Sequence, residues 1–257
     1  MPDAGDVVVV DNGSDDGTTE MVRRRFPRAA VIELGENRGP AARTVGVRLV
    51  DAECVAFADD DSWWEPGSLR RAADLFDRHP RLGLIAGRVL VGADQRVDPV
   101  SLAMAASPLP AADDLPGRPV LGFVACGAIV RRSAFLAAGG FRGERVGGEE
   151  AMLAIDMASC GWALRYVPEI VAHHHPSSLR DGDARTYAET VNTLTTAWAR
   201  RPAASAVKAT ARAAIRSHRR PVRHALLRLL REAPSIARDR RPAPELVERQ
   251  LRLLEEG

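Results

Sequence analysis

The sequence contains three consecutive aspartates, Asp59, Asp60 and Asp61, whose carboxylates are close enough in the chain to act together in ligand binding or catalysis. They follow an apolar run at residues 54–58 that has the length and composition of a buried strand. Open α/β sheets bind ligands at the carboxyl ends of their strands, so the triplet is expected at a ligand-binding edge. Its mutual repulsion favours a divalent cation, and an all-oxygen site suits Mg²⁺ or Mn²⁺ better than zinc. The alternative is a solvated acidic turn.

A second acidic pair, Glu149 and Glu150, follows two glycines and opens a segment, residues 151–160, in which apolar residues recur at helical spacing. The dipole at a helix N-terminus favours ionised carboxylates, so this pair could supply a general base. Ordinary acids of a first helical turn are the alternative.

Three histidines, His173, His174 and His175, end the last predicted strand. A neutral imidazole could complete the shell of a cation held by Asp59 and Asp61. Neighbouring side chains on an extended segment alternate in direction, so His173 and His175 are expected to face one way and His174 the other. A histidine-rich surface turn is the alternative.

Two loops near the N-terminus carry polar residues at the ends of predicted strands. The valine-rich strand at residues 6–10 leads to Asp11, which is either a ligand-binding side chain or a turn aspartate. A second loop precedes Pro40, which fits the first position of a helix. Since helix N-termini bind anions, Arg38 or Arg43 could meet a diphosphate there. The alternative is that both arginines are solvated.

The elements that must position these groups are strands without polar alternation, which are typical of a sheet covered by helices on both faces. Strands are expected at residues 6–10, 31–34, 54–58, 84–91, 122–130 and 164–171. Residues 63–67 are predicted to form a bend, with at most one of the two tryptophans in the core. Residues 98–119 hold five prolines and are predicted to form a long loop.

Charge is distributed unevenly along the chain. Residues 180–257 hold 17 basic and 9 acidic residues, whereas residues 1–179 hold 19 basic and 25 acidic residues. We therefore expect a catalytic domain at residues 1–180 and an arginine-rich helical extension at residues 181–257, with breaks at Pro202, Pro221, Pro234 and residues 240–242. The extension either packs on the catalytic domain as a cap or rests on an anionic membrane surface. Nucleic acid is not an expected partner, because the basic tail has no interleaved aromatic residues.

The three cysteines are far apart and lie in apolar surroundings, so neither a disulfide framework nor a zinc site is indicated. No signal peptide opens the sequence. The longest clean apolar run, residues 121–130, is about half the ~20 residues that a membrane helix needs. The sequence favours a cytoplasmic protein. Any membrane contact is expected to be peripheral, at the inner face of the plasma membrane.

The order of these motifs resembles family 2 glycosyltransferases of the GT-A fold. The matching segments are residues 7–18, 37–43, 57–61, 148–150 and 173–175. The resemblance covers residues 6–178 and implies an α/β fold, Rossmann-like, of the nucleotide-diphospho-sugar transferase type, with a mixed sheet. Members of the family usually carry a further strand and helix before the valine-rich strand, so the resemblance implies an N-terminally incomplete catalytic domain.

The resemblance also implies roles for individual residues. Asp11 would contact the nucleotide base, and Asp59 and Asp61 would bind the ribose and, through a metal, the diphosphate. Glu150, beside Glu149, would deprotonate the acceptor hydroxyl for inverting transfer, and His173 or His175 would complete the metal shell. The full set expected to bind the donor is Asp11, Asn12, Gly13, Ser14, Asn37, Arg38, Gly39, Arg43, Asp59 and Asp60.

The expected activity is transfer of a sugar from a UDP- or dTDP-linked donor to a glycan or lipid-linked acceptor in cell-envelope or glycoconjugate synthesis. The alternative is a non-catalytic scaffold that keeps the fold without a complete donor site.

Overall fold

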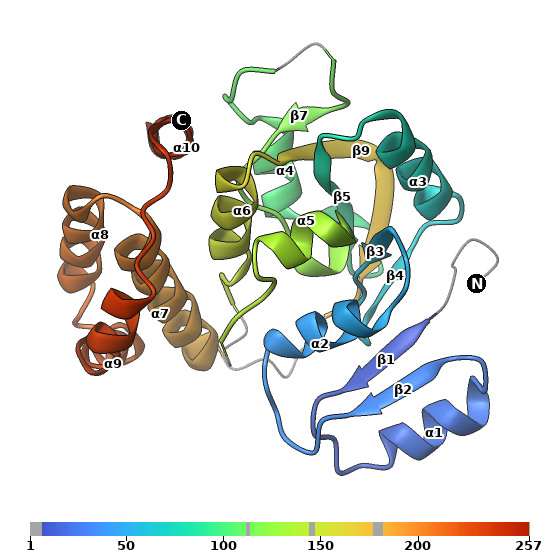
Figure 1. Ribbon diagram of the computed structural model, residues 1–257. Helices are drawn as coiled ribbons and strands as arrows, with labels where there is room; N and C mark the ends of the chain where they lie inside the picture. Colours follow the sequence, from blue (N-terminus) through green and yellow to red (C-terminus); the bar gives the residue numbers. More distant parts are fainter. Residues whose placement is uncertain (1–6, 112–113, 144–146, 177–181, 257) are drawn as a thin grey trace.

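In the computed structural model, which describes residues 7–111, 114–143, 147–176 and 182–256, a mixed β-sheet lies among helices and a helical bundle stands to one side (Figure 1). The boundary expected between residues 180 and 181 lies outside the described residues.

The chain begins with a small parallel unit. β1 (Val8–Asp11) pairs in parallel with β2 (Ala30–Glu33), and the helix α1 (Thr18–Arg25) connects the two strands. The next helix, α2 (Ala41–Leu49), packs on β1, and Gly46 permits this approach because a Cβ there would lie 2.9 Å from Val10 Cγ2. In the parallel register Asp11 lies opposite Glu33, so the carboxyl ends of β1 and β2 lie side by side.

The larger sheet has the strand order β3-β8-β5-β9-β4, with β6 paired to β5 and β7 paired to β9. The pairing of β5 with β9 is parallel and that of β5 with β8 is antiparallel, so the sheet is mixed. Its strands are β3 (Cys54–Ala56), β4 (Ser62–Trp64), β5 (Leu82–Val91), β6 (Arg96–Val97), β7 (Arg118–Pro119), β8 (Ala128–Arg131) and β9 (Ala163–His174).

Helices cover both faces of this sheet. They are α3 (Ser68–Arg78), α4 (Pro99–Ala105), α5 (Arg132–Ala137) and α6 (Glu150–Ser159), with a 3-10 turn, η1 (Ala125–Gly127), before β8. Adjacent residues of β5 point to opposite faces. Accordingly, Leu84 packs in one core cluster with Phe135 of α5, and Ile85 packs in the other with Phe76 of α3. The expectation of a strand buried on both faces is confirmed.

The chain ends in four helices, α7 (Gly182–Arg200), α8 (Ala203–Ile215), α9 (Arg220–Arg238) and α10 (Glu245–Glu256). Leu194, Leu229 and Ile236 share a small core between α7 and α9, and Val247 of α10 packs with Ile155 of α6. Within the described residues, no helix is long and apolar enough to cross a membrane.

The breaks predicted at Pro202, Pro221 and residues 240–242 coincide with helix ends, whereas the break predicted at Pro234 needs correction. Pro221 lies in the first turn of α9, where its fixed backbone angle suits a helix start, and Pro234 lies inside the same helix. Buried Ile236, just beyond Pro234, packs in the small core. Tertiary packing therefore maintains a helix that the local sequence alone would break.

Residues 98–119, predicted to form a long loop, contain the helix α4. Asp98 starts it, because its Oδ1 accepts a hydrogen bond from the backbone N–H of Val100 at 2.8 Å, and Pro99 occupies the first turn. The number of prolines obscured this capping signal.

Two strand boundaries also differ from expectation. The apolar run at residues 122–130 is buried, but only its end belongs to β8, so its hydrophobicity reflects burial rather than an extended ladder. Conversely, the predicted bend overlaps β4, which pairs with β9. As expected, only one tryptophan is in the core: Trp64 is 7% exposed and donates its indole N–H to the Phe57 carbonyl oxygen at 3.0 Å, whereas Trp63 is 40% exposed.

Candidate functional site

The acidic triplet occupies the turn between β3 and β4. The backbone N–H of Asp59 donates to Ser62 Oγ at 2.7 Å, and the Ser62 hydroxyl donates to the Asp59 carbonyl oxygen at 3.1 Å. These bonds close the turn and leave Asp59 and Asp61 half-buried, while Asp60 is exposed. Sequence reasoning missed Ser62, although serine near aspartate is a common turn signal.

Arg43 of α2 links the acidic turn to the glutamate pair. Its guanidinium forms an ion pair with Asp59, and its Nη1 lies 4.0 Å from Glu149 Oε1. The same group lies over the Phe141 ring, with Cζ 5.6 Å from the ring centroid. The Thr44 hydroxyl donates to the Phe141 carbonyl oxygen at 2.9 Å, which fixes α2 at this place. One cation therefore stands between the two acidic groups that the sequence singled out.

Glu149 and Glu150 lie where α6 begins. Glu150 Oε1 accepts a hydrogen bond from the Ala125 backbone N–H at 3.3 Å, and the Glu149 carboxylate accepts one from the Gly147 N–H. Burial raises the pKa of Glu150 from 4.5 to about 7, and repulsion from Glu149 adds to the shift. The helix dipole alone led us to expect a favoured ionised form. Desolvation and the neighbouring charge outweigh the dipole here.

The Asn12 side chain holds together the loops that follow β1 and β2. Its Oδ1 accepts a hydrogen bond from the Arg38 backbone N–H at 2.7 Å. Its Nδ2 donates to Asn37 Oδ1 at 3.1 Å and to the Gly39 carbonyl oxygen at 3.2 Å. The structure thus brings the two predicted donor-binding loops together.

The remaining residues of these loops support the same arrangement. Asp11, only 7% exposed, accepts a hydrogen bond from the Ser14 backbone N–H at 3.2 Å. Gly13 lies against the second loop, because a Cβ there would be 2.8 Å from the Glu36 carbonyl carbon. The Arg38 side chain pairs with Glu36 at 3.0 Å and is largely exposed.

The three histidines diverge. His174 Nε2 lies 3.4 Å from Asp61 Oδ1. The His173 ring is within 2.6 Å of both Glu65 Oε2 and Gln95 Oε1. The register of β9 against β4 causes this difference, because it places His174 opposite Ser62, next to Asp61.

Trp63 contacts the rings of the other two histidines. It stacks on His173, with ring centroids 5.1 Å apart, and meets the His175 ring at 61° and 4.9 Å. In the part of the chain that the structure describes, no three His, Cys, Asp or Glu residues are grouped to hold a metal ion. Of the predicted ligands, Asp61 lies beside His174, and His173 and His175 lie against Trp63. The donor set of two carboxylates with an adjacent imidazole is nevertheless chemically suited to a hard divalent cation.

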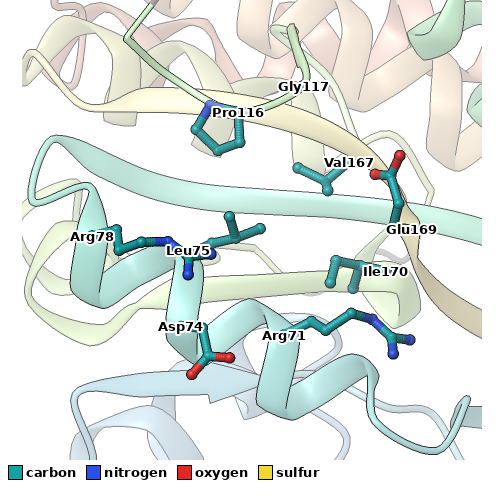
Figure 2. A pocket seen from close by; sticks show the side chains of 9 residues that line it. All are labelled: Arg71, Asp74, Leu75, Arg78, Pro116, Gly117, Val167, Glu169 and Ile170. Carbon is teal, nitrogen blue, oxygen red and sulfur yellow. The ribbon is translucent and has the colours of Figure 1, made fainter.

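A cavity of about 260 Å³ lies elsewhere, between α3, β9 and the segment before β7 (Figure 2). Leu75, Val167 and Ile170 form its apolar part, and the guanidinium groups of Arg71 and Arg78 extend along its rim. None of the predicted site residues lines it. The carboxylate site at the sheet edge is distinct from this cavity.

The mixed sheet, with an acidic turn after β3 and a glutamate pair where α6 begins, has the GT-A fold of nucleotide-diphospho-sugar glycosyltransferases. Two solved structures share this fold. The chain matches a mannosyltransferase from Pyrobaculum calidifontis, in complex with GDP-Man and Mn²⁺, at TM-score 0.57 and 20% identity, covering 98% of this chain and 76% of that one. It matches TarS 1–349 of S. aureus, in complex with UDP-GlcNAc, at TM-score 0.54 and 18% identity, covering 74% of this chain and 57% of that one.

Sequence comparison is more specific. The family described as glycosyl transferase family 2 matches residues 3–137, and the chain belongs to this family. An N-acetylglucosaminyl-diphospho-decaprenol L-rhamnosyltransferase of Mycobacterium tuberculosis is 30% identical over 203 residues, which span 66% of this chain and 66% of that protein, just under two thirds of its length. The predicted family and GT-A fold are confirmed.

Proposed function

We propose that this chain transfers a sugar from a nucleotide-diphosphate donor to a hydroxyl acceptor with inversion at the anomeric carbon. The observation that carries the proposal is the position of Arg43 between Asp59 and Glu149. An expected donor-binding carboxylate and the pair of glutamates that includes the candidate base thus contact one guanidinium.

The two N-terminal loops would hold the nucleotide. Asp11 would meet the base, and the backbone around Asn12 would fit the ribose and phosphates. Arg43 and Arg38 are the cations available to a diphosphate, since arginine matches phosphate oxygens in bidentate fashion. The whole proposed donor set is Asp11, Asn12, Gly13, Ser14, Asn37, Arg38, Gly39, Arg43, Asp59 and Asp60.

A divalent cation, Mg²⁺ or Mn²⁺, fits the carboxylates of Asp59 and Asp61. When bound, it would offset the negative charge of the leaving diphosphate. His174 is the imidazole beside Asp61, whereas His173 and His175, the ligands favoured by the sequence, lie against Trp63. The complex of the Pyrobaculum mannosyltransferase with GDP-Man and Mn²⁺ supports the metal assignment by analogy.

Glu150 would accept the proton of the acceptor hydroxyl while that oxygen attacks the anomeric carbon in line with the departing diphosphate. A carboxylate with a pKa near 7 is a stronger base than an exposed glutamate and is still ionised in a large fraction of molecules at neutral pH. Burial and, in addition, the charge of Glu149 would hold that pKa high.

The acceptor is proposed to be a glycan or lipid-linked hydroxyl in cell-envelope synthesis, and the donor a UDP- or dTDP-sugar. The similarity to a transferase whose name specifies a decaprenol-linked acceptor supports this class. A lipid-linked acceptor would require the protein to work at a membrane surface, and the exposed arginines of α8 and α9 are suited to anionic lipid headgroups.

The test is calorimetric titration of the chain with UDP and with dTDP, each with and without Mn²⁺. We expect metal-dependent binding of one nucleotide, weakened at least about tenfold by Asp61→Ala, because a ligand to the metal is lost. Asp77→Ala, an exposed aspartate on α3, is the matched control and should bind as the wild type does. Equal binding with and without metal, or an unaffected Asp61 variant, would refute the metal assignment. Absence of nucleotide binding in a folded sample would refute the donor site.

A further inference from the structure

The turn before α6 has a backbone that only glycine adopts readily. Gly147 has φ +125° and Gly148 has φ +80°, and residues with a Cβ are strained in that region. Glu149 and Glu150 follow directly, so these two glycines set the direction in which both carboxylates leave the chain. Glycine also gains more conformational freedom than other residues when a turn loosens, so the pair needs external support.

Helix α7 of the C-terminal extension lies against this turn. Asn192 Nδ2 donates to the Gly147 carbonyl oxygen at 2.7 Å. A Cβ on Gly148 would lie 3.8 Å from the Asn192 Cβ, and a Cβ on Gly147 would lie 3.3 Å from the Glu189 Cγ. α7 thus gives the turn both a short hydrogen bond and a packing surface.

α7 can serve as a support because it is itself fixed to α6. Arg200 is 2% exposed and donates to both carboxylate oxygens of Asp156, from Nε at 2.5 Å and from Nη2 at 3.1 Å. Its Nη1 donates to the Asp239 carbonyl oxygen at 2.9 Å, which adds the end of α9 to the same contact. Bidentate arginine–carboxylate pairs restrict geometry as well as stabilise it. α7 is therefore bound at two places: to the turn before α6 through Asn192, and to α6 itself through Arg200.

We propose that Asn192 is a positioning residue for the Glu149–Glu150 pair, so that the helical extension forms part of the catalytic apparatus. The inference rests on the proposed function, since it takes Glu150 as the base. Asn192 belongs neither to the donor-binding loops nor to the acidic turn. Its loss should slow the transfer step and leave donor binding intact.

The test compares Asn192→Leu, which removes the amide at similar volume, with Thr195→Val, an isosteric change at another half-buried position of α7. A misplacement near 1 Å can cost about 100-fold in rate. We expect Asn192→Leu to lower kcat by roughly 10- to 100-fold while the donor KM and the nucleotide Kd stay within about twofold. Amide hydrogen exchange at residues 147–150 should accelerate in this variant and not in Thr195→Val.

A parallel loss of kcat and nucleotide affinity would assign Asn192 a merely structural role and overturn the inference. So would unchanged exchange at residues 147–150. If the wild-type chain transfers no sugar, the proposed function fails, while exchange measured without substrates still decides the positioning role. Asn192→Ala replaces the leucine variant if that variant does not fold.

Discussion

At the residue scale, the pKa of Glu150 determines how the activity should depend on pH. A general base acts only when it is deprotonated, so kcat/KM should rise with pH up to about 7 and then level off. Glu150→Gln cannot accept a proton and should lower the rate by a factor of about 10² to 10⁴. Glu149→Gln keeps the base and removes the repulsion, so its pH midpoint should move to lower pH. Initial rates of the wild type, Glu150→Gln and Glu149→Gln, measured at pH values on both sides of that midpoint, provide the check.

The Glu150→Gln substitution also allows an independent check of the raised pKa through the free energy of unfolding. Because folding raises the pKa of Glu150 from 4.5 to about 7, the folded chain binds the proton more tightly than the unfolded chain. Its stabilising contribution is fully present below pH 4.5 and is lost as the pH rises through about 7. Glu150→Gln should therefore gain free energy of unfolding relative to the wild type above that range and show no gain below it. An equal difference at both ends of the range in urea unfolding would contradict the raised pKa.

At the element scale, the parts of the fold that local chemistry controls could be predicted from the sequence. The apolar run of β5 and the helical spacing of α3 and α6 require burial on defined faces, and each formed close to its expected boundaries. Asp11 and the acidic triplet were expected at strand ends, and β1 does end at Asp11.

Features that depend on contacts between distant elements could not be predicted. Whether His173 or His174 approaches Asp61 is decided by the register between β4 and β9, which no local pattern encodes. The hydrogen bond from Asn192 to Gly147 joins residues 45 positions apart. Pro234 shows the converse, since a strong local helix breaker is overridden by packing.

The ion pair between α6 and α7 leads to a prediction at this scale. Arg200→Met would leave the Asp156 carboxylate, which is 14% exposed, with Arg142 at 3.5 Å as the ion-pair partner that remains among the described residues. Breaking a buried pair on one side costs about 3 to 5 kcal/mol, so urea unfolding should show a loss of that order. The double variant Arg200→Met/Asp156→Leu removes the stranded charge and should recover most of the loss. A double variant as unstable as the single one would show that the arginine acts through its packing and its hydrogen bonds to backbone carbonyl oxygens rather than through the ion pair.

At the scale of the whole molecule, positive charge is concentrated in the segment that forms α8 and the first part of α9. Residues 203–231 contain eight basic residues and no acidic one. Ile215, Leu227 and Leu230 are 79%, 51% and 72% exposed in the same segment. Exposed leucines among arginines on an amphipathic helix are the features that bind anionic lipid surfaces.

The last prediction tests this surface. The chain should sediment with vesicles that contain phosphatidylglycerol and not with pure phosphatidylcholine, and added salt should release it, because the attraction is screened. Each arginine near such a surface contributes about 1 kcal/mol, so Arg219→Glu/Arg220→Glu/Arg223→Glu should weaken binding by at least about 100-fold. The matched control is Arg24→Glu/Arg25→Glu/Arg28→Glu, which makes the same charge change at and just after α1, across the molecule from α9 (Figure 1). If both triple variants lose binding equally, net charge rather than the α9 surface carries the attraction, and the extension is then a support for α6 and not a membrane contact.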